Sequence, residues 1–263
     1  MQLQPPDFSK LMVLIQFLPL YAVACTFNLC LYIVILPRTL PLIVPPYASL
    51  ELHQCREWVS NICSMITASI CGVGSIVGLF LTSQDQKFYI LEVLTVCLTG
   101  YWLCDTFFRL ANLRVLKKPK FQYFLIFHHL LGLAAIQITV LHVEMLNVKL
   151  LFIFMELGSI LINFRFCLID LKVDKSSLMY ESVSIAMTLT FFVTRLVPVP
   201  YMLYVVFYQC FGLDLNCTAS LKPYLLFNAI IYVVFTLLNI YWFYIMLAGS
   251  YRHYRRKSVT YHV

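Results

Sequence analysis

The sequence predicts an all-α membrane protein that crosses the bilayer about seven times. Its 263 residues are 61% hydrophobic and only 12% charged, whereas soluble domains have roughly twice that charged fraction. Apolar runs recur along the chain, and about 20 helical residues span the ~30 Å hydrocarbon core of a bilayer. We find no internal repeat, low-complexity tract or stretch that resembles a soluble domain.

The amino-terminal region is predicted to hold the first transmembrane helix. Residues 1–10 are polar, and residues 11–36 form an apolar run that is too long for a signal-peptide core and lacks its basic flank. Residues 37–57 contain four prolines, which interrupt helices. We therefore expect a loop at the membrane interface there, so that residues 1–49 comprise a luminal amino terminus, one transmembrane helix and a Pro-rich loop.

Two further spans follow this loop. Residues 58–81 are rich in glycine and serine, which permit close packing between helices. Residues 88–111 form the third span and contain Glu92, Asp105 and Arg109. The strongest basic cluster between two spans comes next, within residues 112–120.

Four more spans complete the predicted bundle. They comprise residues 121–141, 148–170, 180–211 and 224–247, and a basic tail follows at residues 251–263. The run at 180–211 contains two prolines, Pro198 and Pro200, and we interpret it as one crossing with a proline break, because two crossings would leave no room for a connecting turn.

The cysteines and the net charge have simple interpretations. Most of the ten cysteines lie within apolar runs, and no CxxC pair or Cys/His metal spacing occurs. We interpret them as buried apolar residues and predict no metal site and no cofactor. The net charge of +7 is explained by membrane topology, so we predict no nucleic-acid partner.

Charge also predicts the orientation of the chain. With the amino terminus luminal, 13 Lys and Arg residues lie on the cytosolic side, and Arg109 at the end of its span is counted among them. Four lie on the luminal side, Lys149 among them, and Arg165 and Arg195 are assigned to spans. Basic loops favour the cytosol, so we expect a luminal amino terminus and a cytosolic carboxyl terminus. The sequon at Asn216 then falls on the luminal side and is a weak candidate for glycosylation.

Polar side chains within the spans indicate a membrane-embedded site. At ~1.5 Å per residue, Asp105, His128, His129, Asn163 and Arg165 all lie about 8–11 Å from the cytosolic end of their spans. Ionisable groups at such depth are expensive, and they usually face a protein interior or a wet cavity. We therefore predict one polar layer to which three helices contribute.

Two charged residues are predicted to lie deeper. Glu156 and Arg195 lie roughly 21–22 Å from the cytosolic side, so we expect a second, structural ion pair between the fifth and sixth spans. Helical phase places Ser159 and Asn163 on the face of Glu156 and places Arg165 nearly opposite, where it can extend to the cytosolic interface.

The same phase argument separates the two histidines. His128 and His129 are ~100° apart on a helix, so both cannot point straight into one cavity, and we expect one of them to bond a neighbouring helix. A histidine can act as a general base or as a nucleophile towards an acyl group, and a carboxylate such as Asp105 can fix its tautomer. The alternative is that these groups only hold helices together through hydrogen bonds.

At these residues the sequence resembles the TLC-domain family, which includes the ceramide synthases, a translocating-chain-associating membrane protein and a ceroid lipofuscinosis membrane protein. The elements occur in family order over about residues 50–250, and they are closest to the small TLC-domain-containing proteins. They are Glu57-Trp58, Gly100-Tyr101 with Asp105, His128-His129, Glu156, Ser159, Asn163, Arg165 and Arg195.

The resemblance implies a ring of helices around a lipid-sized cavity that contains the histidine pair. In ceramide synthases that pair serves acyl transfer from acyl-CoA to a sphingoid base, which implies a catalytic role for His128 and His129 assisted by Asp105. This chain departs from the synthases in having no HD-x-x-D arrangement after the fifth span, since Asp170 and Asp174 stand there without a histidine. It also departs from the small relatives, with Thr67 where they tend to have a histidine and Ile160 where they tend to have a proline.

Several functions remain open at this point. The first is lipid homeostasis, with the acyl chain of a membrane phospholipid or sphingolipid bound in the cavity. The second is a ceramide-synthase-like acyltransferase that takes acyl-CoA from the cytosolic face, where the basic segment from Arg114 to Lys120 can attract its phosphates. A seven-span receptor lacks its signature motifs here, and a transporter would have broken helices in both halves of the chain. The resemblance favours the endoplasmic reticulum over the plasma membrane, and the oligomeric state is open.

Overall fold

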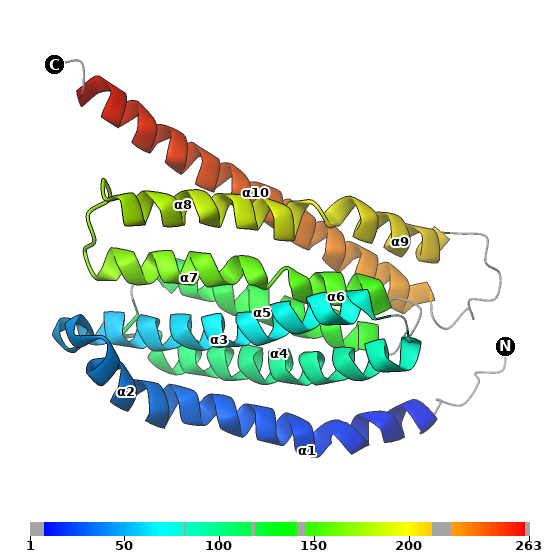
Figure 1. Ribbon diagram of the computed structural model, residues 1–263. Coiled ribbons are helices and arrows are strands. Elements are labelled where there is room, and N and C mark those ends of the chain that lie inside the picture. The colour runs from blue at the N-terminus through cyan, green and yellow to red at the C-terminus, as the bar shows by residue number, and fades with distance from the viewer. Residues whose placement is uncertain (1–7, 82, 117–118, 141–145, 212–221, 261–263) are drawn as a thin grey trace.

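The computed structural model describes residues 8–81, 83–116, 119–140, 146–211 and 222–260, and it confirms an all-α membrane architecture (Figure 1). All regular structure in this part of the chain is helical. Six helical segments in it are long and apolar enough to cross a bilayer, and the apolar helix at Lys120–Ile136 is shorter. The chain is therefore a multi-pass membrane protein, as the composition predicts.

The first span continues through the prolines that were predicted to end it. Helix α1 (Phe8–Cys30) leads through a π-helical turn, η1 (Leu31–Ile35), directly into α2 (Leu36–Ile43). The predicted Pro-rich loop is therefore wrong in its first part. Pro37 lies in the first turn of α2, where a helix does not use the backbone N–H that proline lacks. The connection between α2 and α3 is short and contains one 3₁₀ turn, η2 (Pro45–Ser49). Helix α3 begins at Leu52, after a capping box formed by Glu51 and Gln54.

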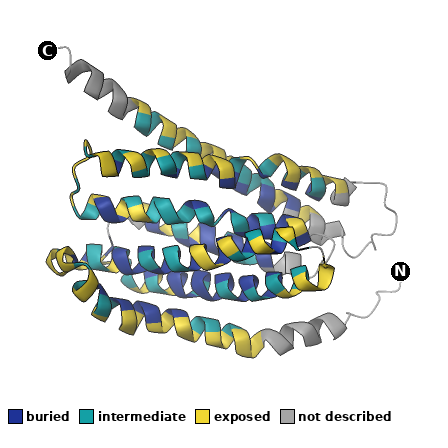
Figure 2. Cartoon of the chain, viewed as in Figure 1, coloured by how far each residue is buried: buried dark blue, intermediate teal, exposed yellow. Residues whose placement is uncertain are grey.

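Helix α4 (Gln84–Asn112) lies at the centre of the bundle. In its most apolar window 72% of the residues are buried, against 17–39% in the other spans. It packs against α1 on one side and α3 (Leu52–Phe80) on the other. Gly100 permits the close approach of α1, because a Cβ there would lie 2.8 Å from Ala24 Cβ. Figure 2 shows the buried positions concentrated on these inner helices, with exposed positions along the outer ones.

Two neighbouring spans are broken near mid-membrane. The predicted span at 148–170 consists of α6 (Leu146–Phe154) and α7 (Leu157–Asp170), separated by Met155 and Glu156. The next crossing comprises α8 (Leu178–Phe191), a π-helical turn η4 (Phe192–Leu196) and α9 (Val199–Phe211), with the break at Pro198 that the sequence predicts. Both breaks lie in the carboxyl-terminal half of the chain, so they do not form the symmetric pair expected of a transporter.

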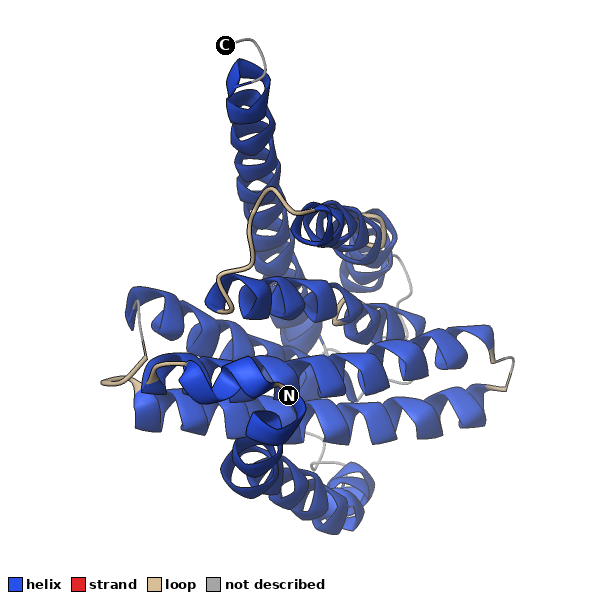
Figure 3. Ribbon diagram, turned by 60° about the vertical axis from the view of Figure 1, so that its left-hand side comes forward, coloured by secondary structure: helices blue, strands red, loops and turns tan. Residues whose placement is uncertain are grey.

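The remaining helices complete the bundle. Helix α5 (Pro119–Val140) packs against α4, and α10 (Lys222–Thr260) packs against α5, α8 and α9. The predicted tail at 251–263 is a continuation of α10 as far as Thr260, and Figure 3 shows this end of the helix standing apart from the others. The start of α1 and the end of α10 lie at opposite ends of the bundle (Figure 1), as an odd number of crossings requires.

Candidate functional site

A cavity of about 500 Å³ lies among α3, α4, α5, α7, α8, η4 and α10. Eight of the nine predicted site residues inside the described part of the chain line it: Tyr101, His128, His129, Glu156, Ser159, Asn163, Arg165 and Arg195. Asp105 does not line the cavity and lies fully buried behind its wall. Asn216 is outside the described residues.

Asp105 is held by donors from three directions. Tyr32 Oη donates to Asp105 Oδ1 at 2.6 Å, and Ser60 Oγ donates to the same oxygen at 2.5 Å. Arg109 Nε donates to Asp105 Oδ2 at 2.5 Å, one helical turn away on α4. A buried carboxylate is expensive unless its oxygens are paired and hydrogen-bonded. These bonds therefore account for a charged group that is 0% exposed.

Arg109 links this carboxylate to the cavity wall. Its Nη1 donates to Gln122 Oε1 at 2.6 Å, and its Nη2 donates to Ser60 Oγ at 2.6 Å. Gln122 Nε2 in turn donates to Glu57 Oε1 at 3.4 Å. The assignment of Arg109 to the cytosolic charges is wrong, since the side chain is only 8% exposed and belongs to the site.

His129 lies between Asp105 and the cavity. Its Nδ1 is 3.3 Å from Asp105 Oδ2, although the pair does not meet hydrogen-bond geometry. The ring stacks on Trp102 with centroids 6.3 Å apart and meets Tyr101 edge-on at 5.7 Å. Because Nδ1 is buried, the nitrogen that this ring can present to a cavity ligand is Nε2.

His128 also lines the cavity, so the prediction that the two histidines cannot both face one cavity is wrong. Its ring packs against Trp242 at 5.6 Å and Phe235 at 5.2 Å, both on α10, and its buried Nδ1 has no hydrogen-bond partner. The two imidazole centroids are 5.9 Å apart. Both rings reach the cavity because it extends from the α3 and α4 side of the α5 helix to its α10 side.

The inner ion pair forms as predicted, although it lines the same cavity rather than a separate layer. Arg195 Nη2 lies 3.9 Å from Glu156 Oε1 and donates to Ser159 Oγ at 2.9 Å. Arg195 Nη1 donates to Asn239 Oδ1 at 3.4 Å. Gly158 makes room for this arrangement, because a Cβ there would lie 2.9 Å from the Thr194 hydroxyl and 3.4 Å from Arg195 Nε.

Helix α7 contributes polar groups in two directions. Asn163 Nδ2 donates to Ser64 Oγ of α3 at 2.8 Å. Arg165 Nε donates to Ser184 Oγ of α8 at 3.1 Å, and its guanidinium lies 5.2 Å from the Tyr180 ring centroid. The expected extension of Arg165 away from the site is therefore wrong, because the cavity wraps around α7 from α3 to α8.

Sequence reasoning missed several residues that shape the site. Tyr32 lies in the π-helical turn η1, and no local pattern connects it with a carboxylate 73 positions later in the chain. Ser60 and Gln122 carry common polar side chains whose partners only the fold identifies. The described residues contain no group of three or more His, Cys, Asp or Glu side chains suited to a metal ion.

The comparison with protein families decides the membership of the chain. A family model of the TLC domain matches residues 57–248. The chain belongs to the TLC-domain family. No curated protein matches the sequence. In this TLC protein Tyr32 lies outside the matched range, so a helix that precedes the matched domain helps to hold its buried carboxylate.

Proposed function

We propose that this TLC-domain protein acts in lipid homeostasis by binding an acyl chain of a membrane phospholipid or sphingolipid in its cavity. The observation that carries the proposal is the cavity itself. Its volume of about 500 Å³ falls within the range of about 300–1,000 Å³ typical of pockets for small organic ligands. Ligand pockets combine a mainly apolar lining with a few placed polar groups.

The lining of the cavity contains both polar and apolar side chains. Polar side chains from α3 and α4 occupy one wall, among them Asn61, Ser64 and Arg109. Apolar side chains from α5, α7, α8 and α10 also line the cavity, and they are Phe121, Leu125, Ile162, Phe166, Ile169, Met187, Phe191, Trp242, Ile245 and Met246. The polar groups of α5, α7 and η4 described above lie among them. An amphipathic lipid matches such a lining, because its hydrocarbon chain packs against the apolar side chains while its polar group forms hydrogen bonds with the polar ones.

We propose the endoplasmic reticulum as the location, with the amino terminus luminal and the carboxyl terminus cytosolic. Taking the buried Arg109 and Lys149 out of the loop charges leaves 12 basic residues against three, so the asymmetry that supports this orientation remains. Accessibility of a carboxyl-terminal tag to protease in intact microsomes tests the orientation.

Lipid extraction and native mass spectrometry of the detergent-purified protein test the binding. The variant Ile162→Trp fills the apolar side of the cavity, and Ile240→Trp adds the same side chain at a 52% exposed position on α10. We expect a co-purifying lipid in the wild type and in I240W and its loss in I162W. A wild-type protein without bound lipid, or equal lipid in both variants, would contradict the proposal.

The approach of Asp105 to His129 favours a second function, acyl transfer of the ceramide-synthase type. A carboxylate facing Nδ1 favours the tautomer whose Nε2 is a free base, and Nε2 is the atom that this ring can offer to the cavity. In such a reaction Nε2 takes a proton from the attacking amine, a C–N bond forms at the acyl carbonyl, and the C–S bond to the thiol of acyl-CoA breaks. The proton then passes to the departing thiolate.

Incubation of the purified protein with an acyl-CoA and a long-chain base distinguishes the two functions. Turnover that is lost in His129→Ala, together with normal folding, would establish acyl transfer. Lipid retained by both proteins without product would leave binding as the function.

A further inference from the structure

An aromatic side chain of α10 packs behind one of the histidines that line the cavity. His128 lines the cavity, and its ring meets Phe235 edge-on with centroids 5.2 Å apart. Phe235 itself does not line the cavity and is only 5% exposed. A chain that extends inward past the histidine pair would therefore meet the Phe235 ring.

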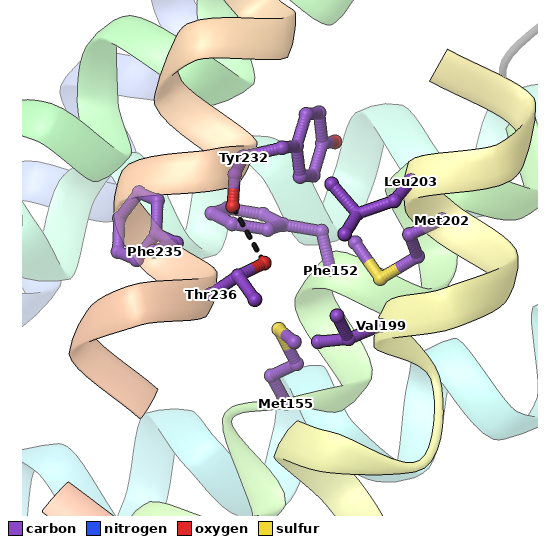
Figure 4. Close-up of a pocket in the computed structure, with 8 residues that line it drawn as sticks. All are labelled: Phe152, Met155, Val199, Met202, Leu203, Tyr232, Phe235 and Thr236. Atoms are coloured by element: carbon purple, nitrogen blue, oxygen red, sulfur yellow. Dashed lines mark hydrogen bonds between the residues drawn. The ribbon is translucent and has the colours of Figure 1, made fainter. Parts of the chain in front are cut away.

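Beyond Phe235 lies a second, much smaller pocket (Figure 4). Its volume is about 10 Å³, roughly the space of one water molecule. Phe235 meets Phe152 of α6 nearly perpendicularly at 5.3 Å, and Met155, Val199 and Met202 line the pocket from the opposite side. The Thr236 hydroxyl among them donates to the backbone oxygen of Tyr232 at 2.8 Å, so it needs no ligand. Such a lining suits hydrocarbon rather than a polar group.

The side of this pocket opposite Phe235 lies at the two helix breaks. Met155 belongs to the break between α6 and α7, and Val199 is the first residue of α9 after the proline break. Methionine side chains are flexible and repack readily around different shapes. The His128 ring and the Phe235 ring behind it therefore separate the cavity from an apolar space whose walls can adjust.

We propose that Phe235 limits the length of the hydrocarbon chain that the cavity binds, with the small pocket as the subsite that a longer chain would enter. This inference rests on the proposed binding of an acyl chain. Without the Phe235 ring, only the His128 ring lies between the two spaces, and the apolar path inward lengthens. The bilayer is as apolar as the pocket, so the ring selects by excluding longer chains sterically, and its removal shifts the bound population towards longer chains.

The test compares the lengths of the acyl chains that co-purify with Phe235→Ala, with Phe235→Trp and with the wild type. Each length distribution is divided by the distribution in the membranes of the same cells. In F235A we expect the ratio of chains two carbons longer to chains of wild-type length to rise about ten-fold, because a shaped apolar pocket discriminates against an added methylene by at least that factor. In F235W, whose larger ring occupies more of the inner end, we expect a shift to shorter chains. If F235A does not fold, Phe235→Leu replaces it.

Phe227→Ala is the matched control, because it makes the same change at a 44% exposed position on the same helix. It should leave the chain-length distribution unchanged. Equal distributions in the wild type and all folded Phe235 variants would overturn the assignment of Phe235 while lipid binding stands. A wild-type protein without any lipid would overturn both the binding and the inference.

Discussion

Helix α4 carries two buried carboxylates whose surroundings differ sharply. Asp105 accepts hydrogen bonds from Tyr32, Ser60 and Arg109. Glu92, 2% exposed, interacts electrostatically with the equally buried Lys149 of α6, but Glu92 Oε1 and Lys149 Nζ both lack hydrogen-bond partners. The first group is built into a network next to the cavity. The second is a pair of opposite charges on neighbouring helices whose charged groups are not in direct contact, away from the residues that line the cavity.

Asp105 positions other groups, whereas Glu92 and Lys149 only compensate each other's charge. The desolvation cost of burying two opposite charges is offset only when further hydrogen bonds satisfy their remaining polar atoms. Asp105 meets that condition and holds Arg109 by a hydrogen bond, so its role is to position the guanidinium at the cavity wall. The Glu92–Lys149 pair does not meet it. Lys149 was also assigned to a luminal loop from the sequence, which is wrong because it lies within α6.

The largest expected effect comes from Asp105→Ala. It leaves Arg109 as a buried unpaired charge, which typically destabilises a protein by about 3–5 kcal/mol. Thermal unfolding in detergent, followed by size-exclusion chromatography, should show a clearly lower midpoint. Asp105→Asn, which keeps an acceptor oxygen, should lose less. An unchanged midpoint in D105A would mean that the network does not stabilise the fold.

A smaller and more diagnostic effect is expected at the second carboxylate. Glu92→Gln or Lys149→Met alone leaves one buried charge and should destabilise the protein by roughly 3 kcal/mol. The double variant removes both charges and should recover most of that loss, because replacing a poorly bonded buried pair by neutral groups is often close to neutral. A double-mutant cycle on the unfolding midpoint measures this. Additive losses would show that the two side chains do not interact.

The smallest effect is expected from Tyr32→Phe. It removes one of the hydrogen bonds to Asp105 and should destabilise the protein by about 1–2 kcal/mol, with the other donors still in place. Tyr241→Phe, at a 58% exposed position on α10, is the matched control. If both variants unfold at the wild-type temperature, the contribution of the first helix to the site is one of packing alone.

Many elements of the fold could be predicted from the sequence, because the length of each apolar run identifies a transmembrane span. The errors occurred where tertiary or backbone context overrides a local rule. Pro37 was expected to end a helix, but a π turn before it and its place in a first helical turn accommodate it. No proline marks the break at Met155 and Glu156, and the nearest glycine, Gly158, already lies in α7. Arg109 and Lys149 were placed by their charge in loops that the helices instead include.

The sequence by itself determined that this chain is a multi-pass α-helical membrane protein and that His128, Glu156 and Arg195 lie among the helices rather than in water. These conclusions depend on hydropathy and on residue spacing, both of which are local. Only the tertiary structure decided that Tyr32 and Ser60 meet Asp105 and that Phe235 packs against His128. Those contacts join helices that are distant in the chain, and which side chains meet between helices depends on the packing of the whole bundle.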